Sequence, residues 1–234
     1  MTTPLAEVAR LTIAGREEYA RIVGSGDAAA VLLVPPLFGE MNRCRRLMVD
    51  VMTELATLGR GSALPDLPGT GESLMPFGAV TLDDWRAMVA ACAALLHAAT
   101  GRTVMIASLR GGALLDDAPD PVDVAGRWRM TPVEGATVLR ELGRAQRLAG
   151  TSGPPLSGAV FAGTPLAPGL AGPLGSARPQ GSARIVRLGE DGKNADERLT
   201  GSPLWRRAEP GRDLAMALAI ARDIDRTAAT CANS

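Results

Sequence analysis

The segment Ser108-Leu109-Arg110-Gly111-Gly112 has the composition of a turn that presents a reactive side chain. It follows the apolar run from Val104 to Ala107, which predicts a buried strand, and it precedes small residues that predict a helix. In acyl-transfer enzymes a G-x-S-x-G turn between a strand and a helix holds the nucleophile at a strained tip. Here Arg110 occupies the tip, or Leu109 if the frame is shifted by one residue.

An arginine at this tip changes the chemistry that the turn can perform. A guanidinium group stays protonated, so Arg110 cannot act as a nucleophile. Its planar fork of N–H donors instead suits a carboxylate, a phosphate or a sugar acid. The alternative role is structural, namely a salt bridge to an acid such as Asp66, Glu72 or Asp116. Both interpretations remain open from the residues alone.

Two further segments are expected at the carboxyl ends of strands, where ligands bind in open parallel sheets. The loop from Pro35 to Asn42 follows an apolar strand and precedes a helix, so its backbone N–H groups are placed to bind an oxyanion, although an ordinary strand-to-helix turn has the same pattern. The turn from Asp66 to Ser73 contains Gly69 and Gly71, which permit a tight reversal. The predicted ligand contacts are Arg110, Gly111, Leu37, Phe38, Glu40, Asn42 and Ser73.

The glycine turn does not match a nucleotide-binding loop. Leu74 stands where a dinucleotide fingerprint would have its third glycine, and no Gly-Lys-Ser/Thr sequence follows. The spacing of Cys44, Cys92 and Cys231 fits no metal site. We therefore expect neither a cofactor nor a metal.

An unconventional hydrolase is the alternative prediction. Its nucleophile would be Ser108 or Ser73, with an acid such as Glu40 or Asp66 as the base, and Ser108 and Asp66 are the catalytic candidates. Ser108 lies two residues before the tip, which directs its side chain into the sheet. His97 is the only histidine, and it lies near the end of the helix before the elbow strand, at the opposite edge of the sheet. A Ser-His-Asp triad is therefore not expected.

The order of hydrophobic segments predicts an α/β fold with a mostly parallel sheet and helices on both faces. The chain, residues 1–234, is interpreted as one domain, in which the Gly- and Pro-rich segment 151–182 forms a loop or a reduced lid. Residues 10–24 predict a hairpin, and the remaining elements alternate. The expected strands are 28–34, 62–66, 104–107, 124–130, 158–163 and 183–188, and the expected helices are 41–58, 81–100, 134–149 and 213–228.

Composition excludes several classes of protein. Lys and Arg together number 25, as do Asp and Glu, so the balanced charge gives no case for binding nucleic acid. No apolar run is long enough to span a membrane, and the N-terminus lacks the pattern of a signal peptide. The three cysteines are interpreted as reduced thiols, which predicts a cytoplasmic protein.

The segments described above, taken in order, resemble the α/β-hydrolase superfamily, and most closely the exosortase A system-associated hydrolase 2 family. The superfamily's D-x-x-G-x-G-x-S turn is matched from Asp66 to Ser73. The other matching blocks are Val34-Pro35-Pro36 to Glu40-Met41-Asn42 with Arg45-Arg46, Asp84-Trp85, Leu109 to Leu115, Trp128 with Thr131-Pro132-Val133, and Pro203-Leu204-Trp205 with Glu209-Pro210.

This resemblance spans roughly residues 18–225 and implies an association with bacterial exopolysaccharide and exosortase systems. An arginine at the elbow is a trait of that family, while the word hydrolase in its name describes the fold and not an activity. The main hypothesis is a non-catalytic protein that binds a small anionic, acyl or sugar ligand, or a protein partner. The unconventional ester or thioester hydrolase is the alternative, and homo-oligomerisation is left open.

Overall fold

The computed structural model describes residues 6–24, 29–117, 124–148, 160–161 and 163–231. Eight strands form one sheet in the order β1-β2-β4-β3-β5-β6-β9-β10. All neighbours from β4 to β10 pair in parallel, whereas β2 pairs antiparallel with both β1 and β4. The strands of this sheet are β1 (Ala6–Ile13), β2 (Arg16–Val23), β3 (Ala30–Val34), β4 (Ser62–Pro65), β5 (Val104–Leu109), β6 (Val124–Met130), β9 (Arg184–Leu188) and β10 (Glu197–Leu199).

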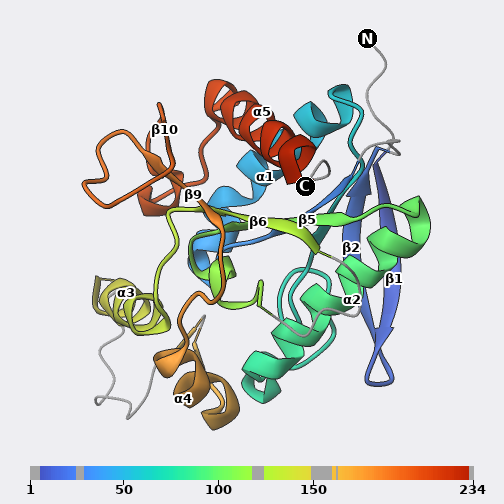
Figure 1. Ribbon diagram of the computed structural model, residues 1–234. Coiled ribbons are helices and arrows are strands. Elements are labelled where there is room, and N and C mark those ends of the chain that lie inside the picture. The colour runs from blue at the N-terminus through green and yellow to red at the C-terminus, as the bar shows by residue number, and fades with distance from the viewer. Residues whose placement is uncertain (1–5, 25–28, 118–123, 149–159, 162, 232–234) are drawn as a thin grey trace.

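Helices cover both faces of the sheet, as the sequence predicts (Figure 1). Helices α1 and α5 pack on one face, and α2 lies on the other face, where residues of α3 and α4 join the same hydrophobic core. The helices are α1 (Gly39–Thr57), α2 (Leu82–Thr100), α3 (Gly135–Leu148), α4 (Pro168–Ser176) and α5 (Leu214–Cys231), with 3-10 turns η1 (Phe77–Ala79), η2 (Arg110–Leu114) and η3 (Leu204–Arg206).

The central strands are buried on both faces because helices lie above and below them. Every residue of β3 and of β5 is buried, which explains why their sequences are almost entirely apolar. Helix α2 begins with a complete capping box between Thr81 and Asp84 and ends at Gly101 in the left-handed conformation. These local signals fix the ends of α2, and so place the start of β5.

Three expectations differ from the structure. Residues 197–199 form strand β10, which is not among the strands that the sequence predicted. Helix α5 continues to Cys231, whereas the sequence predicted that this helix ends at residue 228. The segment 151–182 contains α4 and the short pair β7 (Val160–Phe161) and β8 (Thr164–Pro165), so its described part is not one continuous loop, while 151–159 and 162 lie outside the described residues. No helix among the described residues is long and apolar enough to cross a membrane.

Candidate functional site

The elbow at the end of β5 has its tip at Arg110. Arg110 has a φ of 55°, in the left-handed region that side chains rarely adopt, whereas Leu109 is extended. Gly112 lies against the preceding loop, because a Cβ there would be 2.5 Å from the Pro35 carbonyl oxygen. This geometry settles the frame that the sequence left uncertain by one residue, and it explains the need for glycine at the last position of the motif.

The chain after the tip departs from the prediction. The sequence indicated a helix of small residues, but residues Arg110–Leu114 form only a short 3-10 turn. Gly111 faces Leu37 and Val138, and an added Cβ would lie 3.0 Å from the Leu37 Cγ and 3.2 Å from the Val138 Cγ2. Helix α3, which carries Val138, therefore lies directly on the elbow.

Backbone strain gathers at the carboxyl ends of three strands. Phe38 follows β3 with a φ of 55°, Arg110 follows β5 with 55°, and Thr131 follows β6 with 47°. Ala14, in the turn of the β1–β2 hairpin, is the only other described non-glycine residue with a positive φ. Such residues cost about 1–3 kcal/mol each and are concentrated at functional sites. The strain therefore marks the edge of the sheet at which the sequence predicted ligand binding.

The guanidinium of Arg110 is closed in by two carboxylates and an indole ring. It donates to Glu40 from Nε and from Nη2, at 3.2 and 2.9 Å, and to Glu141 from Nη2 at 2.7 Å. The Trp205 ring lies 5.3 Å from the Arg110 Cζ, in a cation–π arrangement. We call Arg110, Glu40, Glu141 and Trp205 the elbow cluster. The structure shows the salt bridge that the sequence offered as the structural role of Arg110, but its partners are Glu40 and Glu141 and not the acids given as examples, Asp66, Glu72 and Asp116.

The charge balance of the elbow cluster affects Glu40, which sits in the first turn of α1. Burial raises the pKa of the Glu40 carboxyl above its ordinary value, and the hydrogen bond and charge of Arg110 offset this only in part. The nearby charge of Glu141 raises the pKa of Glu40 further. Arg110 therefore pairs with two carboxylates at a partly desolvated position, and the charge of Arg43 also acts to lower the pKa of Glu40.

Ser108 is buried and bound to an acid that the sequence did not assign to it. Its side chain points into the protein, as predicted, and its hydroxyl donates to the Asp116 carboxylate at 2.8 Å. Asp116 in turn accepts two hydrogen bonds from the buried Arg129, at 2.7 and 2.8 Å. The acid that reaches Ser108 is thus neither Glu40 nor Asp66 but Asp116, which is itself held by Arg129.

The glycine turn holds Asp66 and Ser73 in structural hydrogen bonds. Asp66 accepts from Arg45 Nη1 at 2.6 Å and from the backbone N–H of Glu72 at 3.3 Å. The Ser73 hydroxyl accepts from the backbone N–H groups of Gly69 and Met75. None of the hydrogen bonds described for Arg110 reaches these residues, so the structure groups Glu40 and Gly111 with the elbow and separates them from Asp66 and Ser73.

Of the remaining predicted ligand contacts, Leu37 and Phe38 are buried, whereas Asn42 is exposed. Leu37 is buried against Gly111, and Phe38 is buried with its ring edge-on to Phe77 and Trp85. Asn42 is exposed on α1. The sequence therefore placed Leu37 correctly beside the elbow but gave no indication that Asn42 faces solvent.

Neither histidine nor cysteine supplies a catalytic group at the elbow. His97 lies in the last turn of α2, where its Nδ1 is 2.9 Å from the Arg102 carbonyl oxygen. Burial raises the pKa of the Cys44 thiol to about 12, so this cysteine on α1 is not a thiolate nucleophile. No group of three His, Cys, Asp or Glu side chains among the described residues is arranged to hold a metal ion.

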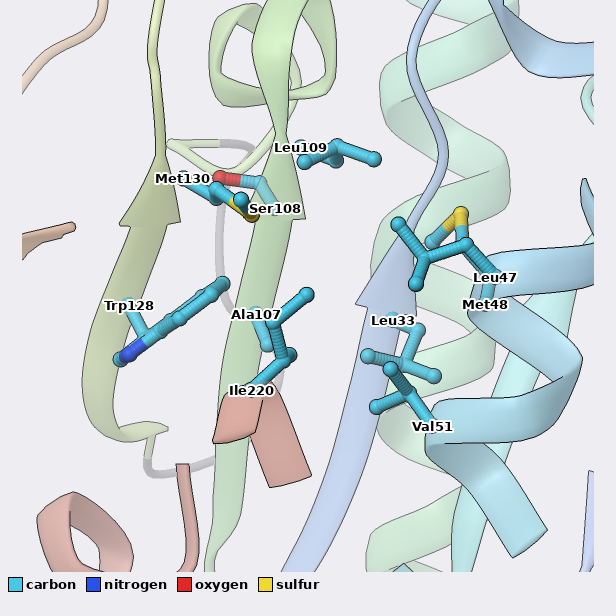
Figure 2. Close-up of a pocket in the computed structure, with 10 residues that line it drawn as sticks. All are labelled: Leu33, Leu47, Met48, Val51, Ala107, Ser108, Leu109, Trp128, Met130 and Ile220. Carbon is cyan, nitrogen blue, oxygen red and sulfur yellow. The ribbon is translucent and has the colours of Figure 1, made fainter. Parts of the chain in front are cut away.

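A small and mostly apolar cavity lies on the α1 side of β5, and Ser108 is among the residues that line it. Its volume is about 20 Å³, room for about one water molecule. Figure 2 shows Leu47, Met48 and Val51 of α1 facing Leu33 of β3 and Ala107 of β5 across it. This cavity is a packing defect of the core and not a substrate pocket.

A larger and open cavity, of about 490 Å³, lies beside the glycine turn. It is lined by Val8, Tyr19, Ala20, Arg21, Arg45, Asp66, Glu72 and Leu74. The sequence contained Arg45 within its matching blocks but gave no signal that it pairs with Asp66. Glu141 and Arg129 were also missed, because their contacts with Arg110 and Asp116 join residues 31 and 13 positions apart.

Comparisons with known proteins identify the fold. No protein-family model matches the chain, and no curated protein matches it. The chain is similar in structure to a putative hydrolase from Agrobacterium vitis S4, with a TM-score of 0.53 over 98% of both chains at 13% identity. It is also similar to Est1E from Butyrivibrio proteoclasticus, a structure with bound ferulic acid, with a TM-score of 0.54, 14% identity and coverage of 76% of this chain and 77% of that chain.

A further likeness is to the epoxide hydrolase VrEH1 from Vigna radiata, with 17% identity and a TM-score of 0.42 over 55% of this chain. The match covers 41% of that chain, so it spans less than half of the length of this relative. At these identities the likenesses show the fold and no activity. The structure and the two neighbours with TM-scores above 0.5 together show that this chain has an α/β-hydrolase fold.

Proposed function

We propose that this chain is a non-hydrolytic protein of the α/β-hydrolase fold that binds a small anionic ligand at Arg110. The observation that carries the proposal is the tip of the elbow, where a strained residue with a φ of 55° is a cation and not a nucleophile. The strain is kept although no nucleophile has to be presented. A retained strained conformation with a changed side chain favours a changed function over a decayed one.

The nearest serine supports the non-hydrolytic part of the proposal. Ser108 is 1% exposed, and its hydroxyl is held by Asp116 on the interior side of the elbow. Asp116 is itself fixed by two hydrogen bonds from Arg129, so its carboxylate is already engaged on both oxygens. A substrate carbonyl would have to displace this buried network before Ser108 could attack it.

The ligand class follows from the charge and geometry of Arg110. A guanidinium beside an aromatic ring suits a carboxylate, a phosphate or a sugar acid. The resemblance to the exosortase-associated family extends this proposal to a cytoplasmic role in an exopolysaccharide system, in which sugar acids are natural candidates. That extension rests on the sequence blocks alone.

A protein partner is the second candidate function. Val8 and Leu74 are 67% and 85% exposed, and both line the open cavity beside Asp66. Exposed apolar side chains at the rim of a cavity favour an interaction surface. This surface is separate from the elbow cluster, so the two candidates can be tested by substitutions at different residues.

Hydrolysis assays test the non-catalytic assignment. We would assay the purified protein, Ser108→Ala and Ser73→Ala against p-nitrophenyl acetate and a short-chain acyl thioester. We expect the three proteins to match the buffer blank. Turnover by the wild type that disappears in Ser108→Ala would establish the unconventional hydrolase instead, and loss in Ser73→Ala alone would assign the nucleophile to the glycine turn.

A further inference from the structure

In the elbow cluster the guanidinium of Arg110 is paired with two carboxylates. Arg110 carries the one cation, and its side chain is 4% exposed, while Glu40 and Glu141 each contribute a carboxylate. One carboxylate would be enough to neutralise the guanidinium. Arg43 adds a further positive charge near Glu40, so Glu141 is distinguished by how it is held and not by an excess of negative charge.

The two carboxylates are held differently. Glu40 lies in the first turn of α1 and accepts from both Nε and Nη2 of Arg110, and its side chain is 19% exposed. Glu141 lies on α3 and accepts one hydrogen bond, from the Nη2 atom that Glu40 also uses, and its side chain is 39% exposed. Glu141 is thus the more weakly held and the more exposed of the two, which makes it the exchangeable carboxylate.

A second donor in the cluster has no partner. Trp205 is 3% exposed, and its indole Nε1 is buried with no hydrogen-bond partner among the described residues. The backbone carbonyl of Trp205 is fixed by Arg43 Nη1 at 2.9 Å. An unpaired buried N–H costs about 1–3 kcal/mol, so it is a donor that a bound ligand would satisfy.

We propose that Glu141 is a built-in occupant of a carboxylate-binding site, and that a ligand carboxylate replaces it on Arg110 and accepts a hydrogen bond from the Trp205 indole. This inference rests on the proposed anion-binding function and names its ligand class and its competitor. The exchange replaces one carboxylate by another, so the net charge at Arg110 does not change. The ligand gains the indole donor, which Glu141 leaves unused.

The position of α3 makes the exchange a gate. Val138, one turn before Glu141 on α3, packs against Gly111 beside the tip of the elbow. While Glu141 is paired with Arg110, α3 covers the guanidinium. A ligand that displaces the Glu141 carboxylate must therefore compete with a group that is tethered to the site. The apparent affinity of the ligand equals its intrinsic affinity multiplied by the fraction of molecules in which Arg110 is uncovered.

Acetate binding to Glu141→Ala tests the proposal. Acetate reproduces the Cγ carbon and the carboxylate group that this substitution removes. The readout is the indole N–H resonance of Trp205 in a proton–nitrogen correlation spectrum, identified by its disappearance in Trp205→Phe. We expect acetate to shift this resonance saturably in Glu141→Ala, with an affinity roughly ten-fold or more above that of the wild type. Chloride at the same ionic strength leaves the resonance in place.

Two further variants keep the test decisive. Glu141→Gln removes the charge while preserving the shape of the side chain, and we expect it also to bind acetate more tightly than the wild type does. Glu134→Ala is the matched control, because Glu134 precedes α3 and pairs with Arg178 at the surface, where both side chains are more than half exposed. It should bind acetate as the wild type does.

The outcomes separate this inference from the proposed function. Equal acetate affinity in the wild type and Glu141→Ala would overturn the gate but leave Arg110 as an anion site. No shift in any variant would overturn both the carboxylate site and the anion-binding function. Hydrolytic turnover by the wild type would overturn only the non-catalytic assignment, whatever acetate does at Trp205.

Discussion

Two regions of the molecule combine a buried tryptophan, arginine and carboxylate with opposite results. In the first, the elbow cluster, one arginine meets two carboxylates, and the Trp205 N–H has no partner among the described residues. In the second, Asp223 on α5 accepts from the Trp128 indole N–H at 2.8 Å and from two arginines. We call this second group, Asp223, Trp128, Arg184 and Arg226, the anchor cluster.

The difference lies in how donors and acceptors are matched. The hydrogen bonds from Arg184, Trp128 and Arg226 outweigh the burial of Asp223 and lower its pKa to about 2, whereas burial raises the pKa of Glu40. Arg110 is also held at a positive φ. In the anchor cluster these residue types therefore form a network in which the indole donor and the carboxylate are paired. In the elbow cluster the indole donor is left unpaired among the described residues, which suits the binding of a ligand.

The largest expected effect comes from removing the acceptor of the anchor cluster. Asp223→Ala leaves the buried Trp128 N–H unpaired and releases Arg184 and Arg226, so we expect a loss of about 3 kcal/mol in the free energy of unfolding. Urea denaturation measures this. The control is Asp83→Ala, at an exposed position on α2. A loss no larger than that of the control would remove the basis of the comparison.

Matched Trp→Phe substitutions probe the two indole groups directly. Trp128→Phe loses a hydrogen bond to an ionised carboxylate, whereas Trp205→Phe removes a donor that has no partner in the described part of the chain. Both lose similar ring volume, so the difference between them isolates the N–H groups. We expect Trp128→Phe to be less stable than Trp205→Phe by about 1.5–2 kcal/mol in urea denaturation. Equal losses would mean that the Trp205 N–H is satisfied in solution.

The pH dependence of stability should have opposite signs in the two clusters. The lowered pKa of Asp223 contributes about 2 kcal/mol above its unfolded pKa of 3.8, and this is lost as the pH falls towards 2. The raised pKa of Glu40 means that the folded state binds a proton more tightly than the unfolded state does, so stability falls as the pH rises above 4.5.

Denaturation curves from pH 2 to pH 7 separate the two contributions. Asp223→Asn should flatten the loss between pH 4 and pH 2, and Glu40→Gln should flatten the decline above pH 4.5. Identical pH profiles for Glu40→Gln and the wild type would show that the desolvation of Glu40 is relieved in solution.

The sequence predicts the fold well because its strands and helix ends carry local signals. The apolar runs of β3 and β5 and the Thr81–Asp84 capping box depend on neighbouring residues, and the structure confirms each of them. Strand β10 was missed because its three residues, Glu-Arg-Leu, show no apolar run. They form a strand only because β9 offers an edge to pair with.

The candidate site was predicted in position but not in pairing. The elbow, the Leu37 loop and Arg110 follow from motif spacing, which is local. The partners of Arg110 do not, because Glu40 and Glu141 lie 70 and 31 residues away and reach it only after α1 and α3 have packed on the sheet. Tertiary packing brings Glu40 and Glu141 to Arg110 in place of Asp66, Glu72 and Asp116. All five have carboxylates, and nothing in the sequence excludes the last three as partners.

The smallest expected effect is the stability change on removing Glu141, and it decides whether the elbow is a second anchor. Glu141 is 39% exposed and shares its donor atom with Glu40, so Glu141→Ala should change the free energy of unfolding by less than about 1 kcal/mol. Alanine also suits a helix. Urea denaturation beside Glu134→Ala measures the difference. A loss of unfolding free energy as large as that of Asp223→Ala would mean that both carboxylates are required to stabilise the buried Arg110. Glu141 could then not be exchanged for the carboxylate of a ligand.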